Sequence, residues 1–214
     1  MGRPESYIPA LGHDLLTPLY DPLLRWLMRE DRFKRRLVEQ AEIGEGQRAL
    51  DPGCGTGTLT VMVKQTRPRA EVVGLDGDVN VLKIARSKAA RAGVGLLLHQ
   101  GMAYEIPYTD GYFDRVLSSL MLHHLSTRDK GRALAEVFRV LRRGGELHVV
   151  DFGPPRTLYS RLAAFVAARS EQADDNVHGR LPGMFREAGF EQVEETGQFM
   201  TAAGALSFYR ARKL

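Results

Sequence analysis

The chain has 214 residues, enough for one well-buried α/β domain and too few for two domains of ordinary size. Its 30 basic and 26 acidic side chains leave a net charge of +4, which is spread along the sequence rather than gathered in a block. That pattern permits an anionic substrate but gives little support to a nucleic-acid partner, so we expect a small-molecule partner.

Cysteine content and hydropathy bear on location. The single cysteine, Cys54, excludes an intramolecular disulfide and a multi-cysteine metal site, so we expect no bound metal and a reducing, cytoplasmic location. No apolar run approaches the roughly 20 residues that cross a bilayer, and the start M-G-R-P-E-S lacks the apolar core of a signal peptide. The sequence therefore predicts no transmembrane segment, and it leaves the oligomeric state open.

The first 43 residues are expected to form a helical extension to a main domain at residues 44–214. Asp21 and Pro22 favour a helix start, and a second helix carries Phe33, Leu37 and Val38 at helical spacing. Two interpretations stay open. The helices either pack on the core or cover the ligand site as a lid, with Tyr20 as an aromatic contact.

A glycine-rich stretch, R-A-L-D-P-G-C-G-T-G-T-L-T, runs from Arg48 to Thr60. It reads as a buried strand, a tight turn with Gly53, Gly55 and Gly57, and then a helix. Glycines let a ligand lie against bare main chain, and a helix N-terminus offers unpaired N–H groups to it. This order of elements is typical of nucleotide binding.

The spacing within this stretch indicates the kind of nucleotide. It fits neither the dinucleotide pattern G-x-G-x-x-G nor the phosphate-loop pattern G-x-x-x-x-G-K-S/T. Asp51 stands at the tip of the strand. A carboxylate at this point suits a cationic ammonium group better than a pyrophosphate, because two negative groups repel each other.

The next strand, over residues 69–75, ends at Asp76 and is followed by a helix over 79–92. A carboxylate at the end of the second strand of such a unit reaches the ribose hydroxyls of an adenosine. The alternative role for Asp76 is to cap the following helix. Asp78 is better placed for that, so we favour the ribose contact.

The pattern D-x-G-C-G-T-G resembles motif I of the class I S-adenosylmethionine-dependent methyltransferases, specifically those of ubiquinone and menaquinone biosynthesis and their small-molecule relatives. I-P-Y-T-D-G-Y-F-D and L-R-R-G-G resemble later family blocks in the same order. The resemblance implies a Rossmann-like α/β fold: a seven-stranded mixed sheet with the last strand antiparallel and helices on both faces. It also implies S-adenosylmethionine as cofactor and a phenol, quinol, enolate or amine as methyl acceptor.

One family position departs from the pattern. Met102 stands where the family has an acid that meets the adenine amino group, while the backbone N–H of Ala103 can still meet a ring nitrogen. We expect binding to survive with one polar contact fewer, since a neutral hydrogen bond contributes about 0.5–1.5 kcal/mol, and the thioether can pack on the ring. The cofactor contacts that the resemblance implies are Asp51, Gly53, Cys54, Gly55, Thr56, Gly57, Asp76, Gly77, Met102, Ala103 and Ser119.

Two histidines, His123 and His124, follow the fourth predicted strand at residues 113–119. Open α/β folds bind ligands at this edge of the sheet, and a histidine can accept a substrate proton at neutral pH. The alternative is that both are structural or shield the cofactor. Of the two we favour His123 as a base, which would suit a phenol or enolate acceptor.

The other elements complete the α/β pattern. In chain order they are a buried third strand at 94–100, a helix from 126 or 127 to 141, a two-glycine turn, a fifth strand at 146–151, an amphipathic helix at 158–169, a polar and mobile segment at 174–180, a helix at 181–188 and two closing strands. His178 and Arg180 are possible substrate contacts. The helix at 158–169 is expected to pack on the sheet, with a membrane-surface role as the alternative.

Three other functions remain as alternatives. A nucleic-acid methyltransferase would be expected to show an N/D-P-P-Y/F/W tetrad after the fourth strand or a strongly basic face, and Ser118-Ser119-Leu120-Met121 is not that tetrad. A lipid methyltransferase and a non-catalytic S-adenosylmethionine-binding module stay open.

Overall fold

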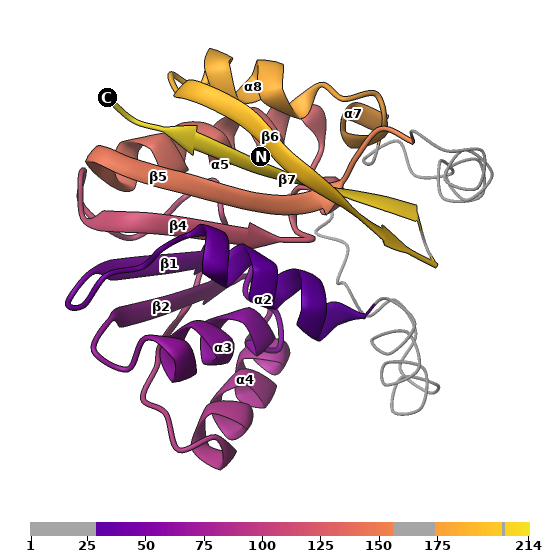
Figure 1. Ribbon diagram of the computed structural model, residues 1–214. Helices are drawn as coiled ribbons and strands as arrows, with labels where there is room; N and C mark the ends of the chain where they lie inside the picture. The colour runs from indigo at the N-terminus through magenta and orange to yellow at the C-terminus, as the bar shows by residue number, and fades with distance from the viewer. Residues whose placement is uncertain (1–28, 156–173, 203) are drawn as a thin grey trace, which may run out of the picture.

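The computed structural model describes residues 29–155, 174–202 and 204–214. Strands and helices alternate and build one seven-stranded sheet with helices on both faces (Figure 1). In chain order the elements are α2 (Glu30–Gln40), β1 (Arg48–Pro52), α3 (Thr58–Thr66), β2 (Glu71–Asp76), α4 (Val79–Arg91), β3 (Leu97–Gln100), β4 (Phe113–Ser119), η1 (Leu122–His124), α5 (Thr127–Val140), β5 (Leu141–Phe152), α7 (Asp174–Val177), α8 (Leu181–Glu187), β6 (Glu191–Thr201) and β7 (Gly204–Arg212).

The strand order is β3-β2-β1-β4-β5-β7-β6. Strands β1 to β5 run parallel to one another, whereas β7 is antiparallel to both β5 and β6. This arrangement confirms the predicted Rossmann-like mixed sheet with an antiparallel last strand. Within the described ranges, no helix has the length and apolar content that a bilayer crossing requires.

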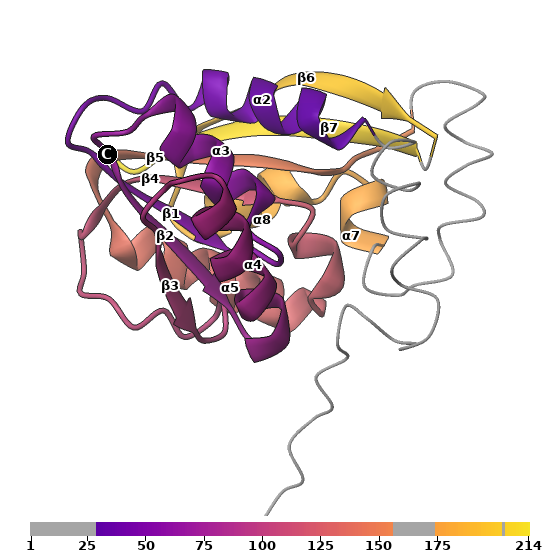
Figure 2. The ribbon, with the colours of Figure 1, turned by 90° about the horizontal axis from the view of Figure 1, so that it is seen from below.

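The core lies in two layers, one on each face of the sheet. Helices α2 and α3 cover one face, where Phe33, Leu37 and Leu59 are buried against strand residues. Helices α5 and α8 cover the other face (Figure 2), where Leu134 and Phe185 belong to a second apolar cluster. Ordinary burial of apolar side chains from both helix layers therefore holds the strands and fixes where their ends lie.

The described part of the N-terminal extension belongs to the core. The predicted helix with Phe33, Leu37 and Val38 is α2, and all three side chains are buried. Tyr20 and the first predicted helix lie outside the described residues, as does the predicted helix at 158–169. The lid and the division at residue 43 therefore stay predictions.

The third strand differs from the expectation. We predicted a buried strand from its leucines, but Leu97 is 48% exposed and most of β3 faces solvent. The physical reason is its position: β3 ends the strand order and pairs with β2 alone among the described strands. An apolar run indicates a strand, but it does not indicate whether that strand is central.

The fifth strand also differs, because it starts earlier than expected. Helix α5 begins at Thr127, one of the two starts that we predicted, and Ser126 caps it, but β5 begins at Leu141, directly after the helix ends. Its register with β4 shifts between the pairs Phe113↔Leu141 and Arg115↔Glu146. The two glycines therefore lie in an irregular stretch of the strand rather than in a turn before it.

The segment at 174–180 is not the polar, mobile stretch that the sequence suggested. It begins with helix α7, in which Asp175 and Asn176 are buried. Asp175 accepts hydrogen bonds from the Thr127 hydroxyl at 2.6 Å and from Lys130 Nζ at 3.1 Å, and both donors belong to α5. A buried carboxylate with several donors holds this segment in place, which hydrophilicity alone did not reveal.

Candidate active site

Three strands carry an aspartate at their carboxyl ends. Asp51 lies in β1, Asp76 is the last residue of β2, and Asp151 lies one residue before the end of β5. Because these strands run in the same direction, their ends lie along one edge of the sheet. Figure 1 shows α7 near the end toward which β4 and β5 run. Open α/β sheets bind ligands at such an edge.

The loop after β1 is tied to the end of β2 through backbone groups. The amides of Gly53 and Cys54 donate to the carbonyl of Leu75 at 2.7 and 3.0 Å. The amide of Gly55 donates to the Asp76 carboxylate at 2.8 Å. These hydrogen bonds fix the backbone of the loop after β1 beside the Asp76 carboxylate at the end of β2.

The three glycines of this loop have positive φ angles of 69°, 52° and 73°. A Cβ on Gly53 would come within 2.2 Å of the Met121 side chain, and one on Gly57 within 2.8 Å of Ala85. A Cβ on Gly55 would meet nothing within 4 Å. Close packing thus requires two of the glycines, whereas Gly55 borders open space into which a ligand can fit.

Asp51 is a buried carboxyl group, only 4% exposed. The hydroxyl of Thr60 donates to it at 2.7 Å. Burial raises the pKa of Asp51 to about 7, against the opposing effects of the Thr60 hydrogen bond and the charge of Lys34. Ionising the buried Asp51 carboxyl group costs free energy, and a cationic ligand beside it would offset that cost.

Asp76 and Asp78 divide two roles between them. The Asp76 carboxylate accepts the amide of Asp78 at 2.9 Å on one oxygen and that of Gly55 on the other. Asp78 caps α4 by accepting the amide of Asn80 at 2.7 Å, which confirms the expected cap. Each carboxylate oxygen offers about two acceptor sites, so Asp76 can still accept hydrogen bonds from a ligand.

The other predicted contacts in these two loops have partners within the protein. Cys54 is buried, and burial raises the pKa of its thiol, so it is no nucleophile. The hydroxyl of Thr56 accepts a hydrogen bond from Lys88 at 3.0 Å, and the carbonyl of Gly77 accepts one from Gln100 at 3.3 Å. Any cofactor contact by these residues stays a prediction.

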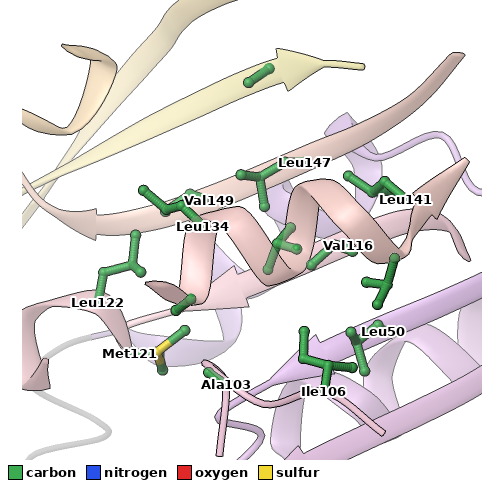
Figure 3. Close-up of a cluster of buried hydrophobic side chains, with 14 of the residues drawn as sticks. Leu50, Ala103, Ile106, Val116, Met121, Leu122, Leu134, Leu141, Leu147 and Val149 are labelled. Atoms are coloured by element: carbon green, nitrogen blue, oxygen red, sulfur yellow. The ribbon is translucent and has the colours of Figure 1, made fainter. Parts of the chain in front are cut away.

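The loops after β3 and β4 meet at the same place. Met121 packs against Gly53 and shares an apolar cluster with Ala103 (Figure 3). Met102 precedes Ala103 and uses its carbonyl to accept the amide of Glu105 at 3.0 Å. The structure therefore brings Met102 and Ala103, which we predicted near the adenine, close to the loop after β4 and the glycine loop.

Ser119 ends β4, and its hydroxyl is buried with no hydrogen-bond partner among the residues that the structure describes. An unpaired buried hydroxyl is uncommon in proteins and calls for an explanation. A polar ligand group at this strand end would supply one. The observation agrees with the predicted contact of Ser119 with the cofactor and does not test it.

His123 lies in the short helix η1 and faces the end of β5. Its Nδ1 is 2.8 Å from Asp151 Oδ1. Asp151 is fully buried and also accepts the backbone amides of Leu122 at 2.9 Å and Phe152 at 2.8 Å. Burial acts to raise the pKa of Asp151, but His123 and the hydrogen bond from Phe152 outweigh it and hold the pKa below its usual value.

His124 stacks on its neighbour. The two imidazole rings are 4.0 Å apart at an interplanar angle of 40°, and the Phe152 ring meets His123 edge-on at 4.8 Å. Burial, with a smaller effect from His123, lowers the pKa of His124 to about 4. His124 is therefore neutral at neutral pH.

The two predicted substrate contacts on the following segment have partners of their own. Arg180 donates to the Asp175 carboxylate at 3.1 Å, and His178 Nδ1 lies 2.9 Å from the carbonyl of Asp174. Both interactions stay within this segment, which packs against η1. They show how α7 is held, and a substrate role for either residue stays a prediction.

Two features of the site were absent from the sequence interpretation. Asp151 had a signal, because it ends the V-V-D run of the fifth strand just as Asp51 and Asp76 end theirs. The contact of Met121 with Gly53 had none, because nothing in the sequence pairs these two loops.

Comparison with known proteins agrees with this geometry. Residues 49–145 match the family described as a methyltransferase domain. A demethylmenaquinone methyltransferase of Thermus thermophilus is 39% identical over 142 residues, which are 65% of this chain and 64% of that protein. A ubiquinone/menaquinone biosynthesis C-methyltransferase of Vibrio cholerae is 31% identical over 85% of this chain and 77% of its own length.

Among solved structures, the YcgJ protein of Bacillus subtilis has the same fold, with a TM-score of 0.68 at 18% identity. That match covers 86% of this chain and 98% of the other. At this identity the likeness supports the fold alone, so the family rests on the sequence relatives. The chain belongs to the class I S-adenosylmethionine-dependent methyltransferases, in the group of the ubiquinone and menaquinone biosynthesis enzymes, and S-adenosylmethionine is its cofactor.

Proposed function

We propose that this enzyme methylates a ring carbon of a quinol-type acceptor and that His123 is its general base. The observation that carries the proposal is a histidine beside a buried carboxylate where β4 and β5 end, next to the glycine loop. The printed names of the relatives, which refer to demethylmenaquinone and to C-methylation, support this acceptor class.

The residues at this edge of the sheet fit the cofactor. Asp51 would hold the ammonium group and Asp76 the ribose hydroxyls, while Gly55 leaves room for the ligand. Ser119 has a hydroxyl that no other described residue uses. When bound, S-adenosylmethionine supplies a methyl group on a positively charged sulfur, which leaves with the electron pair of the broken carbon–sulfur bond.

A pair of glycine substitutions tests the cofactor site. Gly55→Ala and Gly46→Ala both place a Cβ at positive φ in open space, but Gly46 precedes β1 at the opposite end of that strand. Each should cost about 1–2 kcal/mol of stability from the left-handed backbone. Only Gly55→Ala should weaken S-adenosylmethionine binding, by about tenfold, because overpacking a contact costs about 1–3 kcal/mol.

Thermal unfolding and calorimetric titration with S-adenosylmethionine measure the two effects separately. Equal losses of affinity in both variants would show that backbone strain, rather than occupied ligand space, is the cause. An unchanged affinity in Gly55→Ala would place the ligand away from this loop.

His123 suits an acceptor that must lose a proton before it reacts. The histidine takes the proton of a ring hydroxyl, and the resulting phenolate makes the neighbouring ring carbon nucleophilic. Once that carbon holds the methyl group, it loses its hydrogen as a proton and the ring becomes aromatic again. His124, with a pKa of about 4, is the weaker proton acceptor of the pair.

Methyl transfer to defined acceptors tests the proposed function. We would incubate the enzyme with S-adenosylmethionine labelled in its methyl group and with 1,4-naphthalenediol carrying a short prenyl chain at carbon 2. A matched phenol ether, a primary amine and a phosphatidylethanolamine vesicle serve as comparison acceptors. The proposal expects label on a ring carbon of the diol. Label on the amine or the lipid instead, or on no acceptor, would contradict it.

A further inference from the structure

We infer that Asp151 is a positioning residue that keeps His123 ready to accept a proton at Nε2. The inference deepens the proposed function and depends on His123 acting as the base. Asp151 acts through the imidazole and makes no contact with the acceptor. Asp151 lies in the fifth strand, which is the neighbour of the strand that ends at the predicted cofactor contact Ser119.

The carboxylate of Asp151 is fixed in place. It is fully buried in a part of β5 that pairs on both sides, with β4 and with β7. Its two oxygens accept the amides of Leu122 and Phe152 and face His123 Nδ1. Hydrogen bonds from both flanking chain segments prevent it from turning away, so its orientation toward the histidine is set by the fold.

An ionised carboxylate can only accept hydrogen bonds, so the nitrogen facing it must carry the proton. The pKa of Asp151 lies below its usual range, which keeps the group ionised at neutral pH. His123 Nδ1 is then the protonated nitrogen of the neutral ring, and Nε2 has the free electron pair. Within the described residues, His123 makes no side-chain hydrogen bond other than the one to Asp151.

Among the described residues of η1 and α7, the other ionisable side chains are either neutral at neutral pH or paired, Asp174 with His178 among them. His124, stacked on the ring, is neutral at neutral pH. On α7, the carboxylate of Asp175 is already paired with Lys130 and with Arg180. When His123 takes up a proton, the positive ring faces Asp151, which stabilises it.

This arrangement narrows the acceptor class to molecules whose reaction releases a proton to a base, such as a ring hydroxyl. The proton moves from the acceptor oxygen to Nε2 and stays on the imidazole until it is passed to solvent. Asp151 remains ionised throughout and lowers the cost of the charged ring.

The first test is spectroscopic and needs no acceptor. In the wild-type chain of 214 residues, ¹⁵N NMR of labelled histidines distinguishes the two neutral tautomers. We expect His123 to carry its proton on Nδ1. In Asp151→Asn, the amide nitrogen replaces one of the two carboxylate oxygens and cannot accept a hydrogen bond. We therefore expect a shift toward the tautomer of His123 that is protonated on Nε2. A wild-type ring protonated on Nε2 would overturn the inference even if the variant failed to fold.

The second test is a double-mutant cycle in methyl transfer to the prenylated naphthalenediol. Asp151→Asn should lower kcat by about 100-fold, the scale of a general-base contribution, with unchanged S-adenosylmethionine affinity. In a His123→Ala background, Asp151→Asn should lower kcat no further, because the two substitutions remove the same function. Asp151→Glu, which keeps the charge, should recover part of kcat.

The outcomes separate this inference from the proposed function. Full activity of His123→Ala would overturn the base assignment and with it the positioning role. A large loss in His123→Ala together with full activity in Asp151→Asn would overturn the positioning role alone. A loss from Asp151→Asn that persists in the His123→Ala background would show that Asp151 acts on the fold and not through the histidine.

Discussion

Asp51→Asn is expected to weaken S-adenosylmethionine binding by about 10- to 100-fold. A hydrogen bond to a charged group contributes about 1.5–3 kcal/mol, and 1.4 kcal/mol corresponds to a factor of ten. Asparagine can still accept the hydrogen bond from Thr60, which joins the Asp51 carboxylate at 2.7 Å, so the local structure should persist. Calorimetric titration at pH 7.5 measures the effect.

The same substitution should change the pH dependence of stability in a defined direction. The pKa of Asp51 in the folded chain is about 7, above its ordinary value. The folded state therefore holds this proton more tightly than the unfolded state. The resulting stability is fully present below the unfolded pKa of about 3.9 and is lost as the pH rises through 7.

Without ligand, Asp51→Asn should remove this loss, so the variant should gain stability relative to the wild type as the pH rises from 5 to 8. Asp114→Asn is the matched control, because Asp114 accepts hydrogen bonds from Arg48 and Arg142 at the start of β4. The control should bind S-adenosylmethionine normally and lose stability. If Asp51→Asn bound the cofactor as the wild type does, Asp51 would have no role at the site.

His123→Ala is expected to lower kcat by about 10² to 10⁴, the range of general acid–base catalysis. S-adenosylmethionine affinity should be unchanged, because the histidine is proposed to act on the acceptor. His99→Ala is the control, since this histidine is exposed on β3 and pairs with Tyr108. Steady-state kinetics with the prenylated naphthalenediol gives the comparison. Equal turnover in the His123 and His99 variants would contradict the assignment.

The sequence predicted which residues would come together on the cofactor side, and their contact with the cofactor stays a prediction. Asp51, Gly55 and Asp76 belong to a contiguous strand–loop–helix pattern and the strand that follows it, and local rules for turns and caps apply there. The structure joins the loop to the second strand through the bond from Gly55 to Asp76. The capping role of Asp78 was likewise local and was confirmed.

Features that depend on distant parts of the chain were harder to predict. The exposure of Leu97 follows from the place of β3 at the sheet edge, which no local pattern contains. The order in α7 comes from the contact of Asp175 with Lys130, which is 45 positions away. The pairing of His123 with Asp151 spans 28 positions and forms only because β4 and β5 are neighbours.

The most direct measurement is a crystal structure of the 214-residue chain with S-adenosylhomocysteine. We expect the amino group of the ligand against the Asp51 carboxylate, the ribose hydroxyls against Asp76, and the sulfur on the side of the site where His123 lies. A ligand bound elsewhere, or at this edge of the sheet with its ribose away from Asp76, would contradict the proposed cofactor site.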